Sequence, residues 1–148
     1  MSMLFSKKML AFYALVLVLI LSDMMVVYGV SNKMKSALEN AVDGALVFIM
    51  DQEALGYSNI ELYASKAKSA FTDVLRKELE LNKDLSNSTF FKHGVSIDNF
   101  EVAWKNSRPY IRAGISTDID TTLLGKIVSK YNTIEIRNRE QMMWQWAQ

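Results

Sequence analysis

The chemistry open to this chain depends first on its one histidine, His93, in the stretch Phe91-Lys92-His93-Gly94. A catalytic triad or a metal site needs a histidine whose partners are held by neighbouring elements. The residues around His93 have the polar, irregular character of a loop. We therefore expect an exposed loop histidine and not a catalytic or metal-ligating one.

Two pairs of acidic residues invite comparison with calcium sites: Asp51 with Glu53, and Asp118 with Asp120. An EF-hand loop needs further oxygen ligands and a central glycine at fixed positions, and neither stretch has them. We interpret the first pair as the surface of a helix end and the second as a cap at a strand end. The sequence also has no phosphate-binding loop, no GxSxG and no HExxH. We expect a protein that is not an enzyme and that holds no metal or cofactor.

Cysteine is absent from the 148 residues, which excludes disulfides, thiolate nucleophiles and zinc–thiolate or iron–sulfur sites. Lysine and arginine together number 17 and aspartate and glutamate 16, so the chain has no basic excess to hold nucleic acid. Without disulfides, a small exported domain must be held by core packing or by assembly with partners.

The most informative element is the apolar stretch from Met9 to Val30, in which Asp23 is the one charged residue. Its length of about 22 residues matches the roughly 20 that a helix needs to cross a bilayer core. We interpret residues 9–30 as a retained signal-anchor helix in the lipid bilayer, after a short cytoplasmic tail at 1–8. Two alternatives stay open: a signal peptide cleaved near Gly29, and a buried helix of a soluble core.

The lysines that flank this stretch set its expected orientation. Lys7 and Lys8 precede it, whereas Lys33 and Lys35 follow it, so the two sides nearly tie. Because the first flank usually dominates the positive-inside bias, we expect a single-pass protein with its N-terminus in the cytoplasm and residues 31–148 outside.

A helical pattern continues directly beyond the apolar stretch. Apolar residues recur every three or four positions from Met34 through Leu38 and Val42 to Ile49, with Leu46 beside them. This apolar stripe predicts an amphipathic helix over about 31–55, continuous with the membrane helix and together with it roughly 70 Å long. We expect the small domain that follows to leave the stripe uncovered, so that an oligomer or a partner subunit must cover it.

The rest of the chain predicts a second helix over about 59–81, opened by the capping sequence Ser58-Asn59-Ile60-Glu61. The period then changes to two, which predicts strands over about 95–105, 110–116 and 133–137. The first two are expected to form a hairpin that turns at Ser107–Pro109. The fold class is therefore α+β, with a membrane helix, its exported continuation, a second helix and a small antiparallel β-sheet.

Two further segments are apolar. A short helix capped by Asp118 or Asp120 is expected to hold Leu123, Leu124, Ile127 and Val128. The end of the chain, Met142–Trp146, either packs on the sheet or lies at a membrane interface.

Asp23 has two readings, because an acidic residue inside a bilayer costs about 2.5–3.5 kcal/mol at the middle and less toward an end. It either marks the outer end of the span or pairs with a group on a neighbouring helix. The second reading draws on an adjacent face of small and apolar residues that would let another helix approach. That face consists of Ala11, Leu15, Val18, Ser22, Met25 and Gly29.

An apolar N-terminal helix that continues into an exported helix and is followed by a small antiparallel sheet resembles the pilin and pseudopilin architecture. The segment Leu38-Glu39-Asn40-Ala41-Val42-Asp43-Gly44-Ala45-Leu46 resembles the small-residue-rich stretch at that place in TadE-like minor pilins. The chain departs from typical prepilins, which have a glutamate five residues after the glycine at the cleaved bond. Met34 stands at that distance from Gly29, so the resemblance does not extend to prepilin processing.

The resemblance implies a structural or assembly role in a cell-surface pilus or secretion apparatus, with other pilin-like or membrane subunits as partners through the N-terminal helix. We expect a homo- or hetero-oligomer. A different class also fits: a single-span ligand-binding or regulatory subunit of a complex in the cell envelope.

Overall fold

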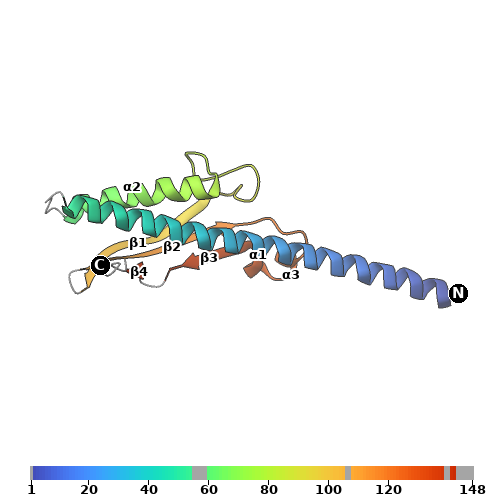
Figure 1. Ribbon diagram of the computed structural model, residues 1–148. Coiled ribbons are helices and arrows are strands. Elements are labelled where there is room, and N and C mark those ends of the chain that lie inside the picture. Colours follow the sequence, from blue (N-terminus) through green and yellow to red (C-terminus); the bar gives the residue numbers. More distant parts are fainter. Residues whose placement is uncertain (1, 55–59, 106–107, 139–140, 143–148) are drawn as a thin grey trace.

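A computed structural model describes residues 2–54, 60–105, 108–138 and 141–142 of the protein. Two helices come first, and a small antiparallel sheet follows, so the fold class is α+β as predicted (Figure 1). In chain order the elements are α1 (Ser2–Ala54), α2 (Ile60–Leu79), β1 (Val95–Lys105), β2 (Arg108–Asp118), α3 (Leu124–Ile127), the 3-10 turn η1 (Ser129–Asn132), β3 (Thr133–Arg137) and β4 (Gln141–Met142).

The first helix, α1, is one unbroken element of 53 residues. No proline interrupts it, and the isolated glycines Gly29 and Gly44 each weaken a helix by only ~1 kcal/mol. The predicted continuity between the apolar stretch and the amphipathic helix is therefore confirmed. The helix also includes the expected tail, because it begins at Ser2.

The two halves of α1 have different surroundings. Side chains from Ser6 to Ser22 are exposed, apart from a few that are half-buried, whereas many of those from Asp23 to Ile49 are buried. Figure 1 shows the N-terminal half projecting alone beyond the rest of the molecule, while α2 and the sheet lie along the C-terminal half. The folded domain therefore begins near Asp23, several residues before the boundary at 30/31 that the sequence suggested.

The apolar stripe of α1 is the centre of the hydrophobic core. All of its members, Met34, Leu38, Val42, Leu46 and Ile49, are at most 1% exposed. They pack with Phe71 and Leu75 of α2 and with Ile111 and Ile115 of β2. The expectation that an oligomer or partner must cover this stripe is wrong for the described fold, because α2 and the sheet cover it within one chain. Burial of each large apolar side chain contributes ~1.5–3 kcal/mol.

The sheet is antiparallel, with β2 in the middle between β1 and β3. The β1–β2 hairpin is confirmed, and its register shifts once, by a bulge between Ile97 and Asn99. Pro109 is not part of the turn, because β2 already includes it and pairs it with Trp104. The fixed φ of proline suits an extended strand near its start, and this explains the difference.

The predicted strand at 133–137 is β3, and a further short strand, β4, pairs Met142 with Tyr110 of β2. Met142 therefore lies on the sheet, whereas Met143–Trp146 are outside the described residues. The side chains of Asp51 and Glu53 and the capping residue Ser58 are outside them too.

The close approach of α1 to α2 depends on Gly44. A Cβ atom built there would lie 2.9 Å from Cγ2 of Val74 on α2, which is too short for a real contact. The glycine therefore lets the two helices pack at this point, although it weakens α1 locally. Gly29 differs, because a Cβ there would meet nothing within 4 Å.

Replacement of Gly44 by leucine should lower the free energy of unfolding by about 1–3 kcal/mol, since the larger side chain overpacks the α1–α2 contact. The matched control is Gly29→Leu, which should not lower it, because the site is open and leucine favours a helix over glycine. Denaturant unfolding of the full chain in detergent micelles measures both. Equal destabilisation by the two variants would contradict this account of Gly44.

Candidate assembly site

Asp23 lies on α1 where the exposed N-terminal half meets the partly buried C-terminal half. Its side chain binds the segment that leads into α3. Its side chain is buried, with the residue only 4% exposed. One carboxylate oxygen, Oδ1, accepts a hydrogen bond of 2.8 Å from the backbone N–H of Thr122. The other, Oδ2, accepts bonds of 2.6 Å and 2.9 Å from the N–H groups of Leu123 and Leu124. The carboxylate thus binds the three N–H groups that lead into α3, which a short helix leaves without intrahelical partners. We call this arrangement the Asp23 junction.

These hydrogen bonds bear on both predictions for Asp23. The carboxylate is held within its own chain, so the reading in which it pairs with a neighbouring helix is wrong for the described structure. The reading in which it marks the outer end of the span stays a prediction, although burial on one face of α1 begins at this residue. The predicted cap for the short helix was also wrong, since Asp23 takes the place expected for Asp118 or Asp120.

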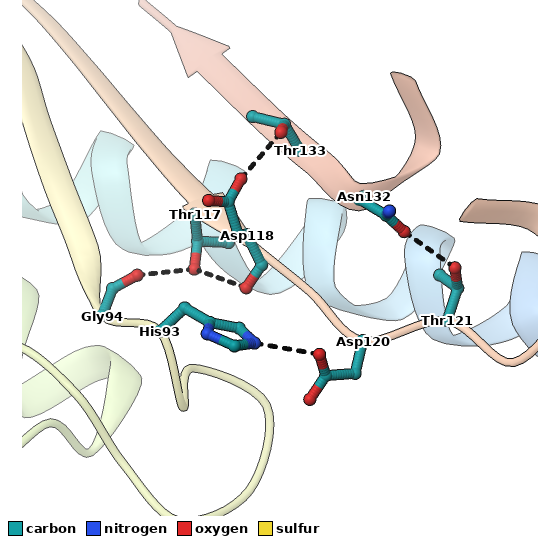
Figure 2. A network of polar contacts seen from close by, with 8 residues as sticks. All are labelled: His93, Gly94, Thr117, Asp118, Asp120, Thr121, Asn132 and Thr133. Atoms are coloured by element: carbon teal, nitrogen blue, oxygen red, sulfur yellow. Dashed lines mark hydrogen bonds and ion pairs between the residues drawn. The ribbon is translucent and has the colours of Figure 1, made fainter. Parts of the chain in front are cut away.

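A network of polar contacts holds the segment between β2 and β3 in place (Figure 2). The buried hydroxyl of Thr117 donates a hydrogen bond of 2.7 Å to the carbonyl of Gly94. At the base of the segment, Thr133 donates one of 2.7 Å to Asp118. Further along, the hydroxyl of Thr121 and the amide side chain of Asn132 are joined at 2.9 Å. These contacts fix the loop that presents its N–H groups to Asp23.

His93 is an exposed loop residue, as predicted, and it has a partner that the sequence did not indicate. Its Nε2 lies 2.9 Å from Oδ1 of Asp120, and both side chains are more than half exposed. The hydrogen bond and the charge of His93 hold the pKa of the Asp120 carboxyl below its ordinary value. The contact joins the loop before β1 to the loop after β2, which is a structural role.

The carboxylate of Asp118 accepts a hydrogen bond from Thr133, and that of Asp120 accepts one from His93. The two acids of the pair therefore bind different partners. Within the described parts of the chain, no group of three or more histidine, cysteine or acidic residues is placed to hold a metal ion.

The face of α1 that the sequence predicts to pack against another helix is exposed. We call it the open face. Its small residues, Ala11, Ser22 and Gly29, are all exposed, and so are Leu15, Val18 and Met25. Asp23 points away from this face and into the domain. The open face and the buried carboxylate are therefore separate features of one helix.

A groove of about 430 Å³ lies at the end of this face nearest the domain. Gly29 and Ser22 of α1 contribute to one wall, and the loop residues Phe90 and Phe91 to the other. The Asn87 side chain shapes that loop, because its oxygen accepts from the N–H of Phe91 and its NH₂ donates to the carbonyl of Leu79. Phe91 is buried as a result, while Phe90 remains half exposed beside the groove. The sequence pattern did not indicate Phe90 or Phe91.

Among the described residues, one helix, covering Ser6–Met50, is long and apolar enough to cross a membrane. Its length, composition and position near the N-terminus are compatible with a single span or with a signal sequence. Comparison of the chain with protein-family models, with curated proteins and with solved structures finds no significant match.

Replacement of Asp23 by alanine should speed hydrogen exchange at the backbone amides of Thr122, Leu123 and Leu124, because each loses a hydrogen bond to a charged acceptor. Glu39→Ala is the matched control, since it removes an exposed carboxylate from the same helix. Exchange followed by mass spectrometry or NMR in detergent micelles measures both. Unchanged exchange at 122–124 in Asp23→Ala would contradict the junction.

Proposed function

We propose that the protein is a non-enzymatic, single-span structural or assembly subunit of a cell-surface pilus or secretion apparatus. One observation carries the proposal: a single helix has an exposed apolar N-terminal half and forms the core of a small α+β domain with its other half. In pilin-like architecture, too, one half of the helix anchors the subunit and the other half supports its folded domain.

The exposed half of α1 supports a place in the membrane. Large apolar side chains there, including Leu10, Phe12 and Leu15, are more than half exposed in the isolated chain. Exposure to water costs about 25 cal/mol for each Å² of apolar surface, whereas the bilayer core removes that cost. In this proposal the N-terminus lies in the cytoplasm and the domain outside it.

The open face of α1 supports assembly through the same helix. In a bilayer the hydrophobic effect no longer drives helices together, so close contact depends on small residues that let backbones approach. Ala11, Ser22 and Gly29 supply such positions along one line, and a Cβ atom at Gly29 would meet nothing within 4 Å. The partners we propose are other membrane subunits, either copies of this chain or similar proteins.

A second candidate, a single-span ligand-binding or regulatory subunit of an envelope complex, is favoured by the groove beside Phe90. Its volume of about 430 Å³ lies within the range of small-molecule sites, and its walls are mainly apolar. A ligand-binding subunit would need the groove free, whereas assembly along the open face would bring a neighbour to its edge.

Protease added to intact spheroplasts should remove the domain, while alkaline carbonate should leave the protein in the membrane pellet. Both results follow if α1 spans the bilayer with its N-terminus inside. A lysed sample is the control for access. A domain that is protected in intact spheroplasts would overturn the orientation, and mature protein that starts near Val30 would overturn the anchor.

Single cysteines test the assembly face, because the chain has no native cysteine to interfere. Ser22→Cys should form disulfide-linked dimers in membrane preparations when an oxidant is added. Met24→Cys is the matched control, since this residue is exposed at nearly the same depth but lies about 200° further round the helix. Equal crosslinking at the two positions would indicate random collision, and absence of both would favour the second candidate.

A further inference from the structure

The segment from Thr121 to Val128, which includes α3, is the part of the domain nearest to the exposed half of α1 (Figure 1). We call it the α3 foot. The Asp23 junction fixes it to α1 by three hydrogen bonds. Val16, Leu19 and Ile20, which share a helix face with Asp23, are half-buried, although most of their neighbours from Ser6 to Ser22 are exposed. The foot therefore lies where the domain begins to cover one face of α1, while Met24, Met25 and Tyr28 on its other faces stay exposed.

The backbone of the foot has hydrogen-bond partners for a run of seven consecutive N–H groups, 122–128. Asp23 accepts from the first three, and the hydroxyl of Thr121 accepts from Gly125 at 2.7 Å. The carbonyl of Leu123 accepts from the N–H groups of 126 and 127, and that of Leu124 from the N–H of 128. All of these acceptors belong to the protein, so the N–H groups of the foot do not depend on bulk water and can enter a layer that holds less of it.

The N–H groups of the foot are bonded within the protein, whereas two of its apolar side chains are exposed. Ile127 is 64% exposed and Val128 43%, and none of the residues of α3 is buried. Lys126 and Lys130, both exposed, flank these two apolar residues. Apolar side chains flanked by lysines are typical of segments that lie in the interfacial layer, where the lysines reach the lipid phosphates.

We propose that the α3 foot inserts into the headgroup layer of the leaflet on the domain's side, so that Ile127 and Val128 contact lipid. This inference rests on the proposed membrane anchoring of α1. The occupant is the lipid of the same bilayer, because the foot lies against α1 where its projecting apolar half meets the domain. The Asp23 carboxylate then has a second function: it satisfies the N–H groups of a turn that enters the interface.

Gly125 is required for this arrangement. A Cβ atom there would overlap the side chains of Asn132 and Thr121, both of which bind the foot's backbone. The missing side chain thus lets Thr121 and Asn132 bind the backbone of Gly125.

The test uses the full chain in liposomes of phosphatidylcholine and phosphatidylglycerol, with an environment-sensitive fluorophore on one cysteine. Ile127→Cys is the probe position, and its exposure leaves the fold undisturbed. Leu15→Cys reports on the middle of the span, and Lys77→Cys, exposed on α2, reports on the part of the domain in water. Lipids that carry a nitroxide either near the headgroup or near the chain ends quench the fluorophore according to its depth.

The expected pattern is emission at Ile127 shifted to the blue relative to Lys77 and quenched more by the shallow nitroxide than by the deep one. Leu15 should show the reverse preference. If Leu15 is quenched while Ile127 behaves as Lys77 does, the foot lies in water and the inference fails, although the anchor stands. If Leu15 is not quenched either, α1 is not in the bilayer, and both the anchor and the foot are overturned.

Discussion

Backbone N–H groups at the start of a short helix need hydrogen-bond acceptors. Here a single carboxylate, from a residue distant in the sequence, provides the acceptors for three of them. Asp23 and Thr122 are 99 positions apart in sequence, yet their contact decides where the domain ends along α1. A neutral side chain of similar size would offer fewer acceptor sites and would form weaker hydrogen bonds, because it has no negative charge. The contact joins α1 to the loop between β2 and β3, which the bonds of Thr121 with Asn132 and of Thr133 with Asp118 hold from the other side.

The second constraint is that α1 combines an exposed apolar half and a half that forms the core, without a break between them. Its N-terminal half needs an apolar surface on all sides, whereas its C-terminal half needs an apolar stripe that faces α2 and the sheet. One helix meets both requirements, the first by its apolar composition and the second by the spacing of its apolar residues, because helix propensity does not distinguish between the two surroundings. Gly44 adds a local requirement, since the helices can approach at Val74 only where a side chain is missing.

Much of the fold could be predicted from sequence because its signals are local. The period of 3.6 residues in α1 and α2 and the period of two in β1 and β2 are set by neighbours along the chain. The partner of the apolar stripe could not be predicted, since a pattern shows that Leu38 and Leu46 face something apolar but not whether it belongs to the same chain. The junction was hidden for a different reason. The groups that bind Asp23 are backbone N–H groups, which carry no residue identity, so nothing in Thr122, Leu123 and Leu124 marks them as its partners. The groove beside Phe90 likewise depends on how the Asn87 loop folds against α1.

The continuity of α1 gives the molecule the mechanics of a lever. A membrane helix tilts on average by about 20° from the bilayer normal, and a bilayer of different thickness or a neighbouring subunit changes that angle. From Asp23 to Ala54 the helix is roughly 45 Å long. No hinge separates this part from the apolar half, and the core is packed around it. In the proposed membrane span, a change in tilt of about 20° would therefore swing the far end of the domain sideways by roughly 15 Å.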